Sequence, residues 1–262
     1  MIREGESALK ESIGVKAENC RFEGRYPLWC CSRVEVSGSE FTSASRAPIW
    51  YSSDLRFSAC VFDSPKSFRE LDRVELVSCR FPSSVETLWN CRNVTLRDCR
   101  FDGADYFFAR SSSLKADGLR LQGKYSFQYC RDIEIRNSHL DTKDAFWESE
   151  NVTVYDSEVK GEYLGWYSKG LTLVRCHISG TQPLCYAKGL RLVDCTFAPD
   201  ADLAFEYSEV EAVINGPVTS VKNPLTGRIE AESFGEIIID ANLKAPGDCV
   251  ISVPDRGPSR GL

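Results

Sequence analysis

Two carboxylates and two cations in the middle of the chain have the residue types of a glycoside-cleaving site. Lys143 and Asp144 lie in the stretch LDTKDAFWESENVTVYDS, Leu140–Ser157, beside the aromatic residues of that stretch. The second cation, Lys124, precedes this stretch, and the second carboxylate, Glu162, follows it. Acid/nucleophile pairs that cleave glycosidic bonds hold their carboxyl groups about 5 Å apart. Whether Asp144 and Glu162 meet at such a distance depends on the elements that carry them.

Those elements belong to one sequence repeat. The segments VELVSCRF (Val74–Phe81), VTLRDCRF (Val94–Phe101), LTLVRCHI (Leu171–Ile178) and LRLVDCTF (Leu190–Phe197) share an apolar alternation followed by Cys. Successive repeats are 19 to 21 residues apart, which is typical of solenoid proteins. Their first residues are Val15, Val34, Leu55, Val74, Val94, Leu114, Ile133, Val152, Leu171, Leu190, Val210 and Ile229.

This period fits leucine-rich repeats and parallel β-helices. The chain lacks the Asn-bearing leucine-rich motif, and its repeats alternate Val, Ile, Thr and Phe with period two, which favours strands. We therefore predict an all-β, single-domain parallel β-helix of about 12 coils over residues 1–240, with 241–262 as a cap or tail of the same domain. Left-handed forms usually show hexapeptide repeats, so a right-handed coil is expected.

The repeat assigns a position in the coil to each residue. Six residues before each repeat start lies an apolar residue, such as Phe68, Leu88, Phe127 or Phe146, which we expect to be buried. Nine of the twelve cysteines fall in two interior columns, where cysteine packs as a small apolar residue. The alternative is a metal or redox centre, but no CxxC pair is present, and we expect neither a metal nor a cofactor.

Other columns predict one long outward face, which we call the stripe: the residues four, five, eight and nine before each repeat start. All five tryptophans fall in one of its columns. Aromatic rings beside a few fixed polar groups suit a ligand site, whereas stacked aromatic and charged side chains also stabilise a parallel sheet by themselves. The predicted ligand-binding residues are Tyr26, Trp29, Tyr125, Tyr129, Trp147, Glu148, Tyr163, Trp166, Tyr167, Asp202 and Glu206.

The same numbering places Asp144 and Glu162 on adjacent coils, one step diagonal, with carboxyl groups about 5–6 Å apart. We expect Lys143 and Lys124, which share a column, to keep Asp144 ionised and to attract an acidic sugar. Glu162 is then the expected general acid, with a raised pKa. The alternative is a surface ion-pair network of the same four residues.

The composition and charge of the chain limit the kinds of partner and the cellular location that we expect. The 262 residues carry a net charge of −6, which argues against a nucleic-acid partner, and no apolar run is long enough to span a membrane. The start of the chain shows no secretory signal, so we expect reduced thiols and a cytoplasmic location. GESALKES (Gly5–Ser12) aligns with GEYLGWYS (Gly161–Ser168), so the first coil is expected near the N-terminus, with an edge that another subunit could pair with.

Several segments carry a resemblance: RYPLW (Arg25–Trp29), KYSFQY (Lys124–Tyr129), LDTKDAFW (Leu140–Trp147), GTQPLCY (Gly180–Tyr186) and DLAFEYSEV (Asp202–Val210). They resemble an uncharacterised bacterial family, known as a domain of unknown function, whose fold is similar to the pectin-lyase-like right-handed β-helix. The resemblance covers nearly the whole chain, and it implies this fold and a cytoplasmic bacterial origin. It supplies no catalytic residues, and where it implies a polar residue after RYPLW this chain has Cys30.

Two classes of function remain open from the sequence. One is an enzyme, a lyase or glycoside hydrolase acting on an acidic oligosaccharide. The other is a non-catalytic module that binds a carbohydrate, another small molecule or a protein through the stripe. Walker, Rossmann and GxSxG motifs are absent from the sequence, so the paired carboxylates are its only candidate catalytic groups.

Overall fold

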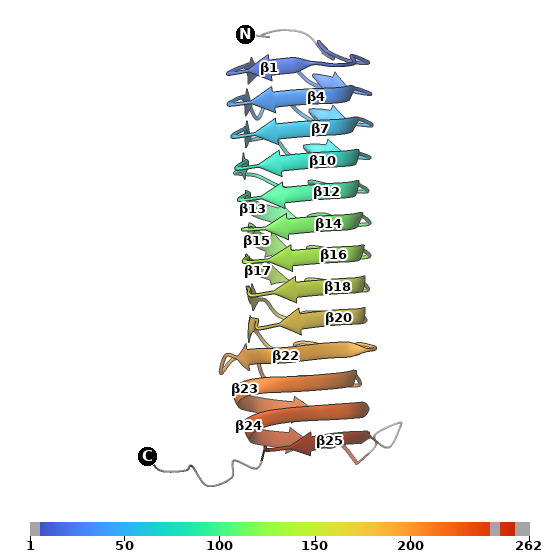
Figure 1. The fold of residues 1–262 in the computed structure, drawn as a ribbon, viewed down its shortest axis with the longest axis vertical. Coiled ribbons are helices and arrows are strands. Elements are labelled where there is room, and N and C mark those ends of the chain that lie inside the picture. The colour runs from blue at the N-terminus through green and yellow to red at the C-terminus, as the bar shows by residue number, and fades with distance from the viewer. Residues whose placement is uncertain (1–5, 242–246, 255–262) are drawn as a thin grey trace, which may run out of the picture.

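The computed structural model describes residues 6–241 and 247–254 and forms a right-handed parallel β-helix. Figure 1 shows the front strands running from right to left while the chain descends and returns behind them, which is a right-handed coil. The predicted fold is therefore confirmed. The described residues contain no helix, and accordingly none with the length and apolar character needed to cross a membrane.

Three rows of strands make up the walls of the coil. The first face, at the front of Figure 1, consists of β1 (Lys16–Glu18), β4 (Ser32–Ser37), β7 (Ser53–Ser58), β10 (Asp72–Val77), β12 (Arg92–Arg97), β14 (Ser112–Asp117), β16 (Arg131–Arg136), β18 (Glu150–Tyr155), β20 (Lys169–Val174), β22 (Leu190–Phe197), β23 (Glu209–Lys222), β24 (Thr226–Ile238) and β25 (Asp248–Ser252).

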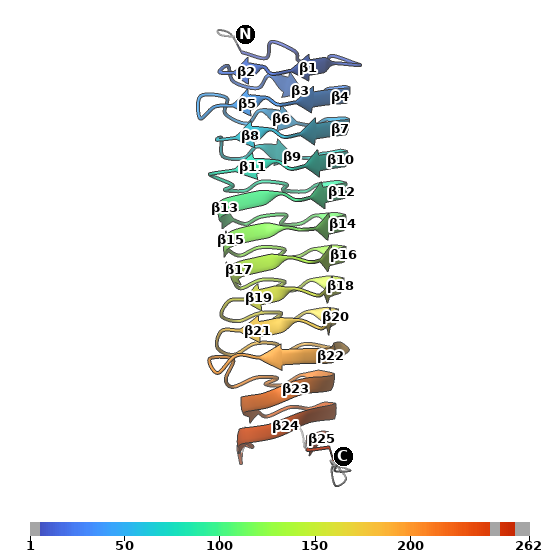
Figure 2. The same ribbon diagram turned by 60° about the vertical axis from the view of Figure 1, so that its left-hand side comes forward.

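The second face follows each first-face strand and is seen in Figure 2. It consists of β2 (Arg21–Phe22), β5 (Glu40–Phe41), β8 (Val61–Phe62), β11 (Arg80–Phe81), β13 (Arg100–Asp105), β15 (Arg120–Lys124), β17 (His139–Lys143), β19 (Glu158–Lys160) and β21 (His177–Ser179). The third face has strands only in the early coils: β3 (Leu28–Trp29), β6 (Ile49–Trp50) and β9 (Phe68–Arg69).

The pairing between coils follows the predicted repeat. Val74 pairs in parallel with Val94, and Val94 with Leu114, so residues at the same repeat position lie one above the other. The segment before β1 stacks in the same way, because Ser7 N donates to Arg25 O at 2.8 Å and Glu11 N to Trp29 O at 2.8 Å. Beyond the twelve predicted starts, β25 pairs in parallel with β24 and adds one more level.

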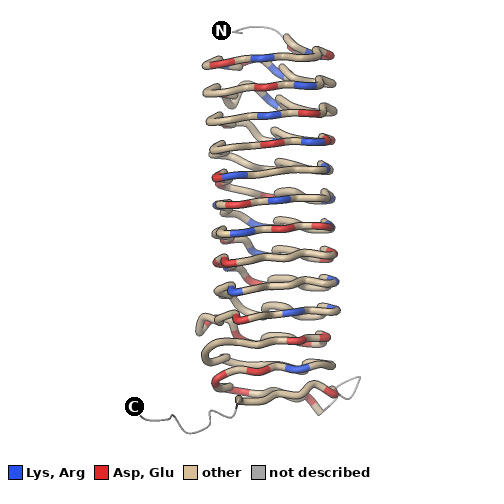
Figure 3. The backbone as a smooth tube through the Cα atoms, in the orientation of Figure 1, with Lys and Arg blue, Asp and Glu red and all other residues tan. Residues whose placement is uncertain are grey.

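The core is a set of stacked apolar columns. Phe68, Leu88, Phe127 and Phe146 are each 0% exposed, as predicted. On the second face the rings of Phe22, Phe41, Phe62, Phe81 and Phe101 stack with centroids 4.3 to 4.7 Å apart. On the outer surface of the first face Lys16, Glu35, Arg56 and Glu75 alternate in sign along the rod (Figure 3), with ion pairs at 3.5 and 3.6 Å. Such cross-strand pairs add to the backbone ladder.

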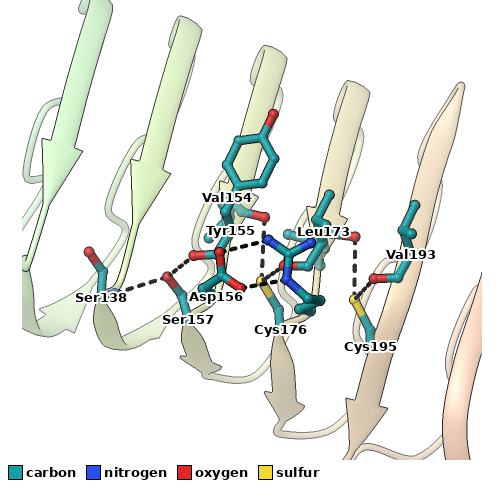
Figure 4. A network of polar contacts seen from close by, with 11 residues as sticks. Ser138, Val154, Tyr155, Asp156, Ser157, Leu173, Cys176, Val193 and Cys195 are labelled. Atoms are coloured by element: carbon teal, nitrogen blue, oxygen red, sulfur yellow. Dashed lines mark hydrogen bonds and ion pairs between the residues drawn. The ribbon is translucent and has the colours of Figure 1, made fainter.

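The interior cysteines occupy positions that serine also fills. Figure 4 shows Ser138, Ser157, Cys176 and Cys195 in successive coils. Each of the four donates to the carbonyl two residues earlier, at 2.6 Å for the serines and 3.5 to 3.6 Å for the cysteines. The residue between, such as Asn137 or Asp156, has a positive φ that turns the chain at the corner. This corner requires a small side chain with one hydrogen-bond donor, which both serine and cysteine provide. The pattern therefore favours the interpretation that these cysteines are packing residues over the alternative of a metal or redox centre.

Substitution of a stacked core ring tests this architecture. Phe146→Ala should lower the free energy of unfolding by about 3–5 kcal/mol, because it leaves a cavity between coils. Lys115→Ala, on an exposed position of β14, should change it by less than about 0.5 kcal/mol. Urea unfolding followed by circular dichroism measures both, and equal effects of the two substitutions would contradict the stacked core.

Thiol labelling tests the cysteine columns. Burial raises the pKa of Cys91, Cys130 and Cys185 to about 12, whereas Cys30 is exposed. Alkylation of the native protein near neutral pH should therefore modify Cys30 first, and the interior thiols only after denaturant is added. Intact mass should be the same with and without reductant. A mass showing three or more disulfides would contradict the expectation of reduced thiols.

Candidate functional site

The stripe lies on the third face, where the chain returns from the second face to the first. In the segment after β17, the residues Asp144, Phe146 and Glu148 have φ of 52°, 60° and 49°, alternating with residues of negative φ. Their N–H groups therefore donate alternately to the next and previous coils: Asp144 to Glu162 O at 2.8 Å, Phe146 to Ser126 O at 3.0 Å. This alternation turns Phe146 inward and leaves Trp147 and Glu148 on the outside.

The tryptophan column is mainly structural. The indole N–H groups of Trp29, Trp50 and Trp166 donate to carbonyls of the following turn, at 2.7 to 2.8 Å. Trp29 stacks on Trp50 at 5.3 Å, and the Arg69 guanidinium lies between Trp50 and Trp89 at 5.2 and 5.0 Å from their rings. These contacts favour the alternative interpretation, stabilisation of the coil, for Trp29 and Trp166.

Tyrosines recur in two further rows along the stripe, and in one coil both rows have a carboxylate where the coils on either side have tyrosine. In one row Tyr106 stacks on Tyr125 at 5.1 Å, Asp144 takes the next position, and Tyr163 follows. The other row runs Tyr129, Glu148, Tyr167, Tyr186 and Tyr207, and the last three rings are stacked at 4.9 and 5.6 Å.

We call this interruption the break: Asp144 and Glu148, with Tyr125, Tyr129, Tyr163 and Tyr167 in the coils on either side. Rings two coils apart are separated by about 9.6 Å. Tyr129 and Tyr167 are 48% and 44% exposed, whereas Tyr186, inside the stack, is mostly covered. Trp147 lies 5.6 Å from the ring of Tyr167 and forms part of the same surface. In the break, Glu148 therefore leaves Tyr129 and Tyr167 without a tyrosine ring stacked between them.

The four predicted catalytic residues lie together, but with different partners from those expected. Lys143 Nζ is 2.9 Å from Glu162, and Lys124 is 3.7 Å from Asp105. Asp144 is 6% exposed, and among the described residues no hydrogen bond or ion pair reaches its carboxyl group. Burial raises the pKa of Asp144, an effect that Lys143 opposes and Glu162 reinforces. Burial thus outweighs the effect of Lys143, so the net shift of the Asp144 pKa is opposite to the one expected from the lysines.

Glu206 is not at the position that the repeat numbering gave it. Tyr186 N donates to Glu206 O, and the ring that continues the tyrosine row is Tyr207. Glu206 occupies the tryptophan column instead, where it is 9% exposed and pairs with Lys222 at 2.9 Å. The spacing of 20 residues before Val210, against 19 in each of the four coils before it, shows that this coil has one more residue but not where that residue lies.

The remaining predicted residues lie at either end of the stripe. Tyr26 packs on Trp29 of β3 with centroids 4.5 Å apart, and β3 lies near the N-terminal end of the rod, far from the break. Asp202 has a buried carboxylate oxygen without a hydrogen-bond partner among the described residues. Gln128, which was not among the residues predicted from the sequence, is a buried amide that donates to the carbonyl of Asp144 at 3.4 Å. Its amide is the one such side chain beside Trp147 and Ala109 in that column, which was the available signal.

No group of three or more His, Cys, Asp and Glu side chains in the described part of the chain is arranged to hold a metal ion. The site therefore consists of aromatic rings, carboxylates and cations. Such a surface can bind a ligand through ring faces and hydrogen bonds, and the buried Asp144 can hold or donate a proton.

Comparison with known proteins assigns the chain to a family. Residues 1–252 match the sequence model of a family described as "Protein of unknown function (DUF3737)", and a search of curated proteins finds no match. A mutant tailspike protein of E. coli bacteriophage HK620, in complex with pentasaccharide, is 11% identical with a TM-score of 0.38, over 89% of this chain and 62% of that one.

Two further solved structures are similar. The catalytic domain of a GH87 alpha-1,3-glucanase, in complex with tetrasaccharides, is 10% identical with a TM-score of 0.30, over 94% of this chain and 63% of that one. HetL, a pentapeptide repeat protein from Nostoc sp. strain PCC 7120, is 10% identical with a TM-score of 0.23, covering 92% of both chains. The chain spans less than two thirds of the tailspike and glucanase chains. These similarities are too low to support an argument about function.

The raised pKa of Asp144 predicts a pH-dependent effect on stability. The folded protein holds a proton on Asp144 more tightly than the unfolded chain does, so the stability it contributes is present at low pH and lost as the pH rises through the folded pKa. Asp144→Asn should therefore raise the melting temperature near neutral pH, with the difference vanishing towards about pH 4. Thermal unfolding across this pH range measures it.

Asp156→Asn is the matched control, for which the expected change in melting temperature has the opposite sign. Arg175 lowers the pKa of Asp156, so this carboxylate stabilises the fold above its unfolded pKa and the stability is lost on acidification. The control variant should melt below the wild-type protein near neutral pH. If Asp144→Asn behaves like Asp156→Asn, Asp144 is not a carboxyl group destabilised by burial.

Proposed function

The chain belongs to the DUF3737 family of proteins of unknown function, and we propose that it binds an oligosaccharide on the stripe, centred on the break. The observation that supports this most is the coincidence of both interruptions in one coil. Four tyrosines frame two carboxylates there, and the tyrosines beside Glu148 are among the most exposed large side chains of the chain.

The chemistry of the break suits a sugar. A pyranose ring has apolar C–H faces that pack on aromatic rings, and hydroxyl groups that donate to carboxylates. The uncovered faces of Tyr129 and Tyr167 supply the first kind of contact, and Glu148 supplies an acceptor. Each of these side chains stands on a coil held by backbone hydrogen bonds to both neighbours, so little conformational entropy is lost when a ligand binds.

A second candidate function is cleavage of the bound saccharide. One observation favours it: Asp144 is buried, its pKa is raised, and it lies within the break, as a proton donor to a glycosidic oxygen requires. Glu162, on the adjacent coil and paired with Lys143, would remain the carboxylate partner. In this interpretation the acid and base roles are the reverse of those expected from the sequence.

Binding can be tested with hexasaccharides, one neutral and one containing uronic acids, by isothermal titration calorimetry. Tyr129→Ala and Tyr167→Ala should each weaken binding about tenfold, because each removes a ring that packs on the sugar. Tyr51→Ala is the matched control: Tyr51 is 54% exposed in the same row but lies outside the break, and its loss should leave the affinity unchanged. Absence of binding at millimolar saccharide would contradict the proposal.

Cleavage is measured separately, by release of reducing ends from the saccharide that binds. If the wild-type protein is a hydrolase, Asp144→Asn should abolish release while the affinity stays close to that of the wild-type protein, since only the proton donor is lost. Glu162→Gln should also reduce release. Turnover that persists in Asp144→Asn would exclude Asp144 as the acid, and absence of turnover in the wild-type protein would leave the binding module alone.

A further inference from the structure

A groove runs along the edge between the stripe and the first face. Its early part, about 470 Å³, reaches from Tyr51 to Asn90 and Arg92. Its later part, about 370 Å³, starts at the same Asn90 and Arg92 and reaches Glu148 and Glu150. The two parts adjoin at these shared residues, and together their lining residues come from six successive coils. Tyr129 and Glu148 line its later part, so the groove opens onto the break.

Three arginines converge on the later part of this groove: Arg92, Arg110 and Arg131. Arg92 begins β12 and Arg131 begins β16, and Ser112 of β14 pairs in register with both. The small Ser112 therefore lies between the two arginines, whose positions on the sheet are two coils or about 9.6 Å apart. Arg110 stands on the stripe side of the same cavity, with its guanidinium 5.3 Å from the ring of Tyr129.

The carboxylates that could neutralise these arginines are engaged elsewhere. Asp72 pairs in register with Arg92, but its oxygens accept from Arg73 and from Asn93 at 2.7 Å. Glu150 pairs in register with Arg131, but it binds Lys169 at 2.7 Å.

Few carboxylates are left to pair with the three arginines. Arg131 lies at 4.0 Å from Asp132, the limit of an ion pair, and no carboxylate of the described residues pairs with Arg92 or Arg110. Three like charges are thus held around one concavity, with Glu148 as the one carboxylate at its far end that forms no ion pair among the described residues. Like charges gathered in a cleft raise the local potential and favour a counter-ion.

We infer that Arg92, Arg110 and Arg131 form a subsite for an oxyanion group of the saccharide, a carboxylate or a sulfate or phosphate ester. Guanidinium groups bind such oxygens through paired N–H donors, which makes arginine well suited to the task. The group would lie over Ser112, with the sugar ring next to Tyr129 and its chain continuing into the break. Assigning the oxyanion to a saccharide rests on the proposed function, whereas the subsite itself rests on the arginines.

The test compares two double variants that remove the same charge. Arg92→Gln with Arg131→Gln removes two cations of the subsite. Arg80→Gln with Arg120→Gln removes two exposed cations of the second face that have no ion pair among the described residues, and is the matched control. Calorimetry measures the affinities for a hexauronate, for a neutral hexaglucan and for inorganic phosphate.

The wild-type protein should prefer the hexauronate at least about tenfold, since each arginine–oxyanion contact is a charge-assisted hydrogen bond. The subsite variant should bind both saccharides equally and lose phosphate binding, while the control variant keeps the preference. Raising the salt concentration should reduce the preference of the wild-type protein.

The remaining outcomes separate this inference from the proposed function. If neither saccharide binds but phosphate binds to the wild-type protein and not to the subsite variant, the subsite stands and the carbohydrate function falls. If saccharide binding depends on Tyr129 but the subsite variant keeps the acidic preference, the function stands and the subsite falls. The subsite is also overturned if the control variant loses the preference to the same extent, or if the wild-type protein binds neither an acidic saccharide nor phosphate.

Discussion

Backbone hydrogen bonding between successive coils is the constraint on which the rest of the structure depends. Each coil uses its N–H and C=O groups on the coils before and after it, including those in the turns, as the bonds of Asp144 and Phe146 illustrate. Polar backbone groups cannot be left unpaired in the interior. A coil must therefore keep the length and register of its neighbours, and residues at one repeat position must form a column.

Columns explain both the stability and the composition of the chain. Inside, stacked rings such as Phe22 on Phe41 and small residues at the corners fill the rod coil by coil. At the corners, the need for a small side chain that donates to a carbonyl admits Ser and Cys alike, which accounts for the high cysteine content. Outside, the same columns align cations with aromatic rings, as with Arg69 between two tryptophans.

Departures from the columns mark the candidate site. A carboxylate in place of tyrosine, at Asp144 and at Glu148, gives up the stacking energy that the neighbouring coils gain. Burial of Asp144 adds a further cost, seen in its raised pKa. Three arginines around Ser112, of which only Arg131 reaches a carboxylate, Asp132 at 4.0 Å, are a third departure, in the groove beside the first two. Sites that give up local stability in one place are candidates for function, because binding a ligand can offset the cost.

The sequence by itself determined the coil length, the parallel β-helix and the inward columns, because a period near 20 residues with strand alternation leaves few other solutions. It also placed the stripe and brought Lys143, Asp144 and Glu162 together. Only the tertiary structure decided which cation pairs with which carboxylate, since several partners lie within one coil spacing and side-chain packing selects among them. Lys124 pairs with Asp105 and Glu206 with Lys222 for that reason. The burial of Asp144, the one-residue shift at Tyr207 and the arginine groove likewise depend on turn geometry, which repeat spacing does not specify.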